Sequence, residues 1–382
     1  MSLSTEATEP TETAPALTQA APTEQPWPLR AFRWLAQGLG YALGLIALMS
    51  VAFWALGISP LTALPALWIG AFGDAANGHL YPLSETLVKT SPLLLTGLSI
   101  VVAWRAGLFS IGGEGQLVMG ALAATALAHA AGKLPGPLLT LLMTLVGIAA
   151  GAFWGLIAGW LRVRRNVQEV ISTIMLNYIG LYLLGWAVEG PLQEQARINR
   201  QSDPLPDAAL FARILPAAWS NGVQTRLHSG VFLAFLAAFV IYVFLYRTRG
   251  GFGLRVLGQN AEAARAAGFP VDRLRMQAMA ISGGLCGLAG VVELLGITGR
   301  LYADFSPGWG YTAIPVALLG GLHPLGTTFS AFFFGALTAG SGNLERFSGV
   351  SSVLINVIQA AAVLAVVGAR AWRARQSGSD GD

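Results

Sequence analysis

Long apolar stretches follow one another along most of this 382-residue chain, with short polar connections between them. A helix needs roughly 20 apolar residues to cross the hydrocarbon core of a bilayer, and lipid offers no partner to an unpaired backbone group. We therefore expect an all-α integral membrane protein, a polytopic bundle of about ten transmembrane helices. The expected spans are residues 38–58, 83–104, 109–131, 137–161, 168–188, 229–246, 276–298, 310–322, 326–343 and 350–369. The eighth and ninth are short, which allows a broken or re-entrant hairpin there.

The composition agrees with a membrane location. Hydrophobic residues make up 54% of the chain and charged residues only 11%, whereas soluble domains contain about 25% charged residues. The net charge of +4 does not indicate nucleic-acid binding, because the basic residues are scattered between apolar stretches, as topology signals are. The single cysteine, Cys286, excludes an intrachain disulfide, and no metal-ligand cluster can be assembled with the four histidines.

Arginine placement predicts the orientation, because cytoplasmic loops carry an excess of Lys and Arg. The arginines that fall on one side of the expected spans are Arg30, Arg33, Arg105, Arg162, Arg164, Arg165, those of 247–275, Arg370, Arg373 and Arg375. That side is expected to be cytoplasmic, with both termini inside and residues 189–228 forming an external loop. We expect one membrane domain, 29–369, between a disordered N-terminal tail, 1–28, and a cytoplasmic C-terminal tail, 370–382.

The expected cytoplasmic loop at 247–275 carries a short pattern made of Asn260, Glu262, Ala263 and Ala264, followed by Gly268. The two small alanines make a helix surface that allows close packing, and Glu262 gives it a charged edge. Gly268 tolerates the left-handed turn that ends a helix. The pattern is typical of an ordinary amphipathic loop helix and equally of a short helix that a membrane subunit presents to a separate motor protein.

A glycine-rich break interrupts the apolar sequence at 107–117, where Gly112, Gly113, Glu114 and Gln116 occur together. Irregular backbone at membrane depth survives only where protein buries it or where it lines a wet cavity, and an ionisable residue there indicates function. Glu114 and Gln116 either hydrogen-bond a polar solute or hold the broken helix in place. No phosphate-binding loop follows the glycines. A weaker counterpart lies at 319–326, and paired breaks in two halves point to a central translocation site.

Four more polar or aromatic residues lie in apolar surroundings. Asn177 either faces a pore or makes an interhelical hydrogen bond, and Glu169 favours the positive N-terminal end of the same expected helix. Glu293 is expected to face the bundle interior or water, because its carboxylate is expensive to bury. Trp309 is either an interfacial anchor or an aromatic face that stacks on a flat ring near an outer mouth.

Glycines at four-residue spacing predict close helix contacts. Gly151, Gly155 and Gly159 repeat on one face of an expected helix, and Gly283 and Gly287 do so further along the chain. Small residues at this spacing let two helix backbones approach closely in lipid. The stripes fit packing within one subunit, and they also fit a dimer seam.

Three segments, taken in order, resemble the permease subunits of bacterial ABC importers. They are Phe109 to Leu117 (FSIGGEGQL), Asn166 to Asn177 (NVQEVISTIMLN) and Gly258 to Gly268 (GQNAEAARAAG). The resemblance is strongest to the nucleoside and simple-sugar branch of the branched-chain-amino-acid/ribose-type permeases and extends over about residues 38–369. It implies a type II importer-like fold. The Ile-x-Leu-Pro ending of maltose-type permeases is missing, since Phe269-Pro270-Val271-Asp272 follows Gly268.

The resemblance also implies roles and partners. Asn260, Glu262, Ala263, Ala264 and Gly268 would form the coupling helix that docks on a cytoplasmic ATP-binding subunit, and the substrate pathway would involve Gly112, Gly113, Glu114, Gln116, Asn177, Glu293 and Trp309. Other expected partners are a second permease, identical or paralogous, an extracytoplasmic substrate-binding protein or lipoprotein, and membrane lipid, but not nucleic acid. The chain is expected to bind no cofactor, ATP being used by the partner subunit, and to lie in the bacterial inner membrane.

Other classes fit the sequence less well. An ion-gradient-driven secondary transporter needs no partner ATPase, and Glu114 and Glu293 keep that alternative open. A non-transporting scaffold does not explain the two interrupted helices. An enzyme is not expected, because no Ser/His/Asp or Cys/His arrangement can be assembled. The expected solute is a nucleoside or nucleobase, with a simple sugar as the alternative.

Overall fold

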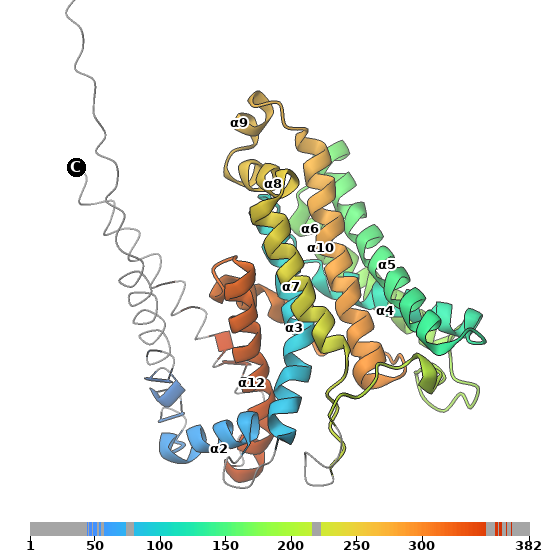
Figure 1. Ribbon diagram of the computed structural model, residues 1–382, viewed down its shortest axis with the longest axis vertical. Helices are drawn as coiled ribbons and strands as arrows, with labels where there is room; N and C mark the ends of the chain where they lie inside the picture. The colour runs from blue at the N-terminus through green and yellow to red at the C-terminus, as the bar shows by residue number, and fades with distance from the viewer. Residues whose placement is uncertain are drawn as a thin grey trace, which may run out of the picture. The chain divides into compact units, whose positions relative to one another are not determined.

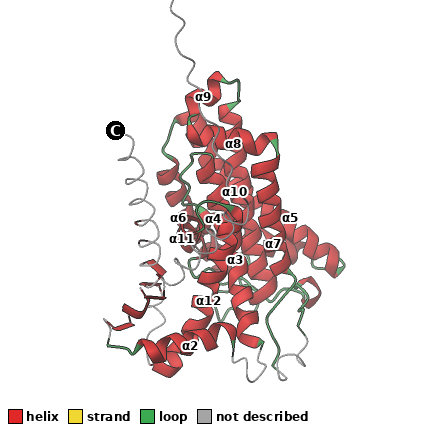
Figure 2. Ribbon diagram, turned by 60° about the vertical axis from the view of Figure 1, so that its left-hand side comes forward, coloured by secondary structure: helices red, strands yellow, loops and turns green. Residues whose placement is uncertain are grey.

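The computed structural model describes residues 57–73, 80–215 and 223–348, with single positions between 44 and 54 and between 356 and 368. The described helices belong to one compact unit, Leu48–Asp382 (Figure 1). The helices are α2 Pro60–Phe72, α3 Tyr81–Arg105, α4 Gly113–Ala131, α5 Gly136–Arg165, α6 Glu169–Glu189, η1 Asp207–Ala209, α7 Gly230–Arg247, α8 Arg249–Gln259, α9 Ala261–Ala266, α10 Val271–Glu293, the π-helix η3 Leu294–Thr298, α11 Trp309–Leu319 and α12 Pro324–Ser348. Among the described residues, only isolated bridges supplement the helices (Figure 2).

Five of these helical segments are long and apolar enough to cross a membrane. They are α3, α5, α6, α7 and the continuous stretch Val271–Thr298 that α10 forms with η3. The all-α membrane fold predicted from the apolar stretches is thereby confirmed. The expected spans 38–58 and 350–369 lie mostly outside the described residues.

Two expectations about single elements are corrected. The span expected at 109–131 begins as a helix only at Gly113, because residues 107–112 leave the helical path. Helix α2 was not expected, since 13 residues are too few to cross a bilayer. It lies instead across the ends of other helices, where Gly70 and Gly340 allow α2 and α12 to touch: a Cβ at Gly70 would lie 2.9 Å from the Gly340 Cα.

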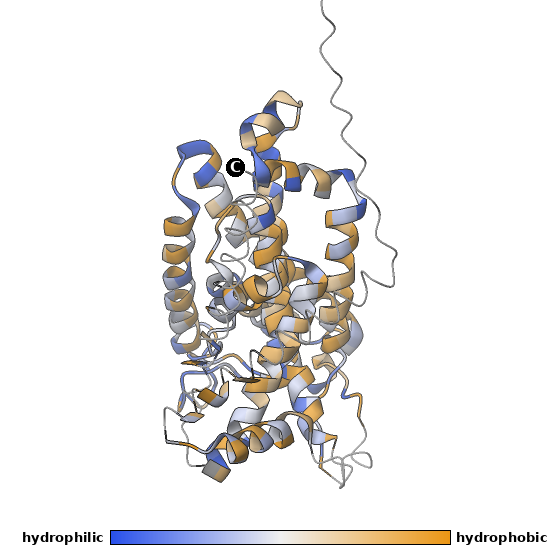
Figure 3. Ribbon diagram, turned by 90° about the vertical axis from the view of Figure 1, so that its left-hand side faces the viewer, coloured by the Kyte–Doolittle hydropathy of each residue, from blue (hydrophilic) through white to orange (hydrophobic). Residues whose placement is uncertain are grey.

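The bundle has two chemically different ends. At one end, here named the arginine-rich end, Gly258 of α8 rests on Arg105 at the end of α3, and Arg162 of α5 pairs with Glu169 of α6. Helices α8 and α9 project at this end, and α2 lies at the other (Figures 1 and 2). Hydrophobic residues follow the helices between the two ends, and hydrophilic residues gather around the projecting helices (Figure 3).

Glycine contacts join α4, α5 and α10 into the central core. A Cβ at Gly151 would overlap the Gly283 carbonyl oxygen, and a Cβ at Gly120 would lie 2.5 Å from the Gly287 Cα. A Cβ at Gly155 would lie 2.5 Å from the Met279 carbonyl oxygen. The glycine stripes therefore pack within the subunit, and the alternative of a dimer seam along these faces is wrong, because their partners are helices of the same chain.

The segment between α6 and α7 folds onto residues 299–303. The Ser202 N–H donates to Leu301 O at 2.7 Å, and the Ala303 N–H donates to Arg200 O at 3.1 Å. Close to the start of α7, His228 is buried and stacks on Phe211. Burial, assisted by the charge of Arg213, lowers the pKa of His228 to about 4. His228 therefore packs here as a neutral ring at physiological pH.

A glycine-to-alanine pair tests the core packing. In Gly287→Ala the new Cβ would overlap the Gly147 carbonyl oxygen, and overpacking of this kind costs about 1–3 kcal/mol. Gly185→Ala is the matched control on α6, since nothing lies within 4 Å of its Cβ position. Thermal unfolding of the detergent-purified chain is expected to show a lower midpoint for Gly287→Ala and an equal or higher one for Gly185→Ala. Equal midpoints for Gly287→Ala and the native chain would contradict close packing.

Candidate functional site

The glycine-rich break meets a second interrupted segment inside the bundle. Gly113 begins α4, and it touches Gly310 near the start of α11: a Cβ at Gly113 would lie 3.3 Å from the Gly310 Cα. A Cβ at Gly310 would overlap the Glu114 backbone nitrogen. Two helix N-termini therefore converge, and only glycine permits this approach of the two backbones.

The counterpart expected at 319–326 has a different role. Gly320 to Leu322 form the turn between α11 and α12, with positive φ at Gly321 and Leu322. The Arg105 Nε donates to Leu322 O at 2.8 Å and ties this turn to the end of α3. The partner of the first break is Gly308-Trp309-Gly310, which the sequence indicated only by two glycines flanking a tryptophan.

Glu114 connects the two breaks. Its side chain is buried, and Oε2 accepts a hydrogen bond from the Gly310 N–H at 2.8 Å. Because Glu114 itself lies in the first turn of α4, its carboxylate is placed between two helix N-termini, where the aligned peptide dipoles favour negative charge. Of the two roles considered for Glu114, the geometry supports holding the broken helices in place.

One face of α6 supports the irregular backbone before α4. Glu169, Thr173 and Asn177 lie four residues apart and each pairs a backbone group of the break. Glu169 Oε1 accepts from the Phe109 N–H at 3.2 Å, and Thr173 Oγ1 accepts from the Ile111 N–H at 3.2 Å. Asn177 both accepts and donates: its Oδ1 accepts from the Gly115 N–H at 2.9 Å, and its Nδ2 donates to Ile111 O at 2.8 Å.

These contacts show what the side chains of Asn177 and Glu169 bind inside the bundle. Asn177 is fully buried and makes interhelical hydrogen bonds to backbone. Glu169 also pairs with Arg162 at 3.2 Å, in addition to its place at the start of α6. Thr173 was not singled out from the sequence, although its four-residue spacing from Glu169 and Asn177 was a usable signal.

The other candidate pathway residues are distributed around this centre. Gly112 and Gln116 lie together, since a Cβ at Gly112 would be 3.1 Å from the Gln116 Nε2. Trp309 is buried between Gly308 and Gly310, where the Thr96 hydroxyl donates to its carbonyl oxygen at 3.4 Å. Glu293 is also buried and ends α10 at the start of η3; its carboxyl group interacts with the Trp309 side chain of the second interrupted segment and with the charges of Arg226 and Lys89.

The expected coupling residues form α9 and its two flanks. The Asn260 side chain caps this helix, because its Oδ1 accepts from the Glu262 and Ala263 N–H groups at 2.9 and 3.0 Å. Gly268 has a φ of 81° and follows the end of the helix, as predicted. Glu262 and Ala263 are exposed, whereas Ala264 is buried in the chain's own core. Asn260 and Gly268 are exposed as well, so Ala264 is the one member of the set that a partner cannot reach.

Comparison with known proteins identifies the family. Residues 83–367 match the family described as branched-chain amino acid transport system, permease component. A glucose ABC transporter permease protein of Haloferax volcanii is 35% identical over 87% of this chain and 88% of its own length. A guanosine ABC transporter permease protein of Bacillus subtilis is 35% identical over 88% of this chain and 92% of its own.

A third relative, a nucleoside ABC transporter permease protein of Lactococcus lactis, is 31% identical over 85% of this chain and 86% of its own length. No solved structure matches this chain. The matched residues 83–367 contain the break, its support on α6 and the α8–α9 projection.

Glu114 provides a test of the site. Glu114→Ala removes the acceptor of the buried Gly310 N–H, and an unsatisfied buried donor costs about 1–3 kcal/mol. Glu114→Gln keeps a side-chain oxygen and is expected to regain most of that stability. Unfolding of the purified variants measures the effect, with exposed Glu345→Ala as the control. If Glu114→Ala left stability unchanged but impaired transport, the carboxylate would serve the solute pathway and not the helix junction.

Proposed function

This chain belongs to the branched-chain amino acid transport permease family as a permease subunit of an ATP-binding cassette importer, and we propose that it carries a nucleoside across a bacterial inner membrane. The observation that supports the proposal most strongly is the pairing of a projecting, capped helix with a helix junction buried in the bundle. The relatives named for guanosine and nucleoside transport, 35% and 31% identical, support the choice of solute.

The motor is proposed to be a separate cytoplasmic ATP-binding subunit. Helix α9 presents Glu262 and Ala263 outward. The preceding helix, α8, is anchored to the bundle by its buried residues Leu254 and Leu257. The arginine-rich end is then the cytoplasmic end, as the distribution of arginines predicts. With that orientation both termini are cytoplasmic, and the segment between α6 and α7 faces the substrate-binding protein.

A mechanical route leads from α9 to the helix junction. Gly258, at the end of α8, rests directly on the backbone of Arg105, and a Cβ at Gly107 would lie 3.2 Å from the Gly258 Cα. Gly107 opens the irregular stretch that leads to α4, and Glu114 connects α4 with α11 through the Gly310 N–H. A displacement of α8 would therefore reach α4 and α11 through close backbone contacts and the buried Glu114 side chain.

Transport is proposed to occur by alternating access. The binding protein delivers solute to the outer face, and closure of two ATP-binding subunits moves the α8–α9 units of two permeases. The second permease is an identical or paralogous chain. Because the backbone of the helix junction is held by side chains of α6 and not by a continuous helix, it can shift as a unit when α8 moves.

Charge reversal at Glu262 tests the coupling. Glu262→Arg is expected to reduce ATP-dependent uptake to background, because it places a cation at the docking surface while leaving the cap by Asn260 intact. Arg164→Glu, a charge reversal at an exposed position of α5 at the same end of the bundle, is the matched control and should retain uptake. Uptake in proteoliposomes containing the whole transporter measures the effect, and unfolding midpoints check that both variants are folded.

Undiminished uptake by Glu262→Arg would refute the docking assignment. Uptake by the native protein that survives ATP depletion and collapses with the membrane potential would favour the secondary transporter instead.

A solute panel tests the substrate. A nucleoside is expected to inhibit uptake of labelled guanosine by the reconstituted transporter, whereas glucose is expected to inhibit at least tenfold less strongly, a difference of about 1.4 kcal/mol in binding. Simple sugars are the second candidate, because the Haloferax relative named for glucose is also 35% identical. Stronger competition by glucose than by any nucleoside would refute the nucleoside proposal and indicate a sugar as the transported solute.

A further inference from the structure

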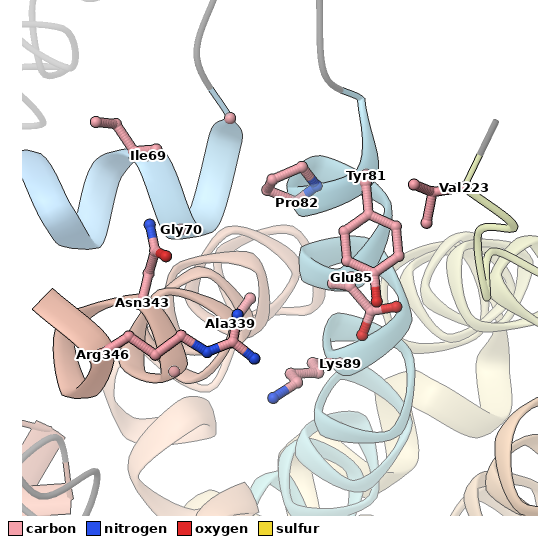
Figure 4. Close-up of a pocket in the computed structure, with 12 residues that line it drawn as sticks. Ile69, Gly70, Tyr81, Pro82, Glu85, Lys89, Val223, Ala339, Asn343 and Arg346 are labelled. Atoms are coloured by element: carbon pink, nitrogen blue, oxygen red, sulfur yellow. The ribbon is translucent and has the colours of Figure 1, made fainter. Parts of the chain in front are cut away.

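A cavity of about 560 Å³ opens between α2, α3 and α12 at the end of the bundle opposite α8 and α9 (Figure 4). Its polar lining consists of Tyr81, Glu85, Lys89, Asn343 and Arg346. The helix junction at Glu114 contributes nothing to this lining. The cavity is therefore separate from the site described above.

The charges that face this cavity do not cancel. Glu85 is engaged by Arg226, whose Nε donates to Glu85 Oε1 at 3.0 Å. Lys89 is half-buried and donates one hydrogen bond to Thr338 O at 3.2 Å; Glu85 and Glu293 act on its charge electrostatically, but among the described residues neither forms an ion pair with it, so two of its N–H groups remain. Arg346 is exposed, and no ion pair joins it to any residue of the described part of the chain. Both cationic side chains extend toward the same space (Figure 4), which therefore favours an anion.

A second cavity of about 560 Å³ adjoins the first and is mostly apolar. Ile69 of α2 lines both, and Phe347 of the second directly follows Arg346 of the first. Trp68, which precedes Ile69 on α2, is exposed, and tryptophan is enriched at membrane interfaces. A cationic cavity and an apolar one thus lie side by side at one face of a membrane protein.

We propose that these two cavities together bind one anionic phospholipid. Its phosphate lies between Lys89 and Arg346, and an acyl chain occupies the apolar cavity against Ile69 and Phe347. An acidic protein segment would satisfy the two cations but leave the apolar cavity empty, whereas a phospholipid occupies both. The lipid would bridge α2 and α12 to α3 at the end of the bundle opposite the ATP-binding subunit. The assignment depends on the membrane location and not on the identity of the solute.

Lipid titration of the full chain tests the site. The detergent-purified, delipidated protein is titrated with phosphatidylglycerol or phosphatidylcholine, and bound lipid is counted by native mass spectrometry. The native chain is expected to bind phosphatidylglycerol at least tenfold more tightly. Arg346→Gln should weaken that binding about fivefold, and the double variant with Lys89→Gln about 25-fold, because a basic residue near a lipid surface contributes about 1 kcal/mol. Arg197→Gln, an exposed arginine that lines neither cavity, is the matched control.

The outcomes separate the possible occupants. Phe347→Ser should weaken phospholipid binding, and glycerol 3-phosphate should compete at least 100-fold less effectively than the phospholipid. Equal binding of the two lipids, or no effect of Arg346→Gln, would overturn the proposal. Arg346→Gln changes an exposed side chain, so the test with this variant does not depend on whether the fold tolerates a substitution of the half-buried Lys89.

Competition by glycerol 3-phosphate at the affinity of the lipid would indicate a free phosphate site. Loss of substrate-binding-protein docking with unchanged lipid binding would indicate a protein surface, and either result would refute a lipid site.

Discussion

The pairing of backbone groups between α3 and α4 is the constraint on which the rest of the structure depends. Residues 107–112 leave the helical path, and apolar surroundings make every unpaired N–H or C=O group expensive. Side chains of α6 satisfy the groups before α4, and Glu114 satisfies the Gly310 N–H at the start of α11. Polar residues that sequence alone would assign to a solute are thereby used to hold the protein's own backbone.

Close glycine packing supplies the rigid frame around this junction. Helices α4, α5 and α10 touch at backbone distance, where any side chain would overlap a carbonyl oxygen. A frame with so little space moves as a body and not by local deformation. The junction of α4 and α11 is different, because it is held by a few hydrogen bonds, and the contact of Gly258 with Arg105 and Gly107 places it next to the projecting helices. This contrast is the physical reason for proposing that the junction moves during transport.

Much of the fold followed from local signals. Apolar length predicted the spans now seen as α3, α5, α6 and α7, and Gly268 predicted the left-handed end of α9. Helix α2 was missed because its 13 residues give no span signal, and Thr173 was missed because a single threonine in an apolar helix is unremarkable until the broken backbone lies beside it. The helix pairs joined by the glycine stripes were equally beyond prediction, because spacing defines a face but not the partner of that face.

The sequence by itself determined the membrane location, the helical spans, the break at Gly112 and the short capped helix that begins after Asn260. Each of these depends on side chains close together along the chain, so hydrophobicity and backbone preference are sufficient. Only the tertiary structure decided that the break meets Gly308–Gly310, that Asn177 and Glu114 bind backbone, and that Lys89 and Arg346 share a cavity with an apolar neighbour. These residues are separated by 60 to 260 positions, and only packing in three dimensions brings their atoms within reach of one another.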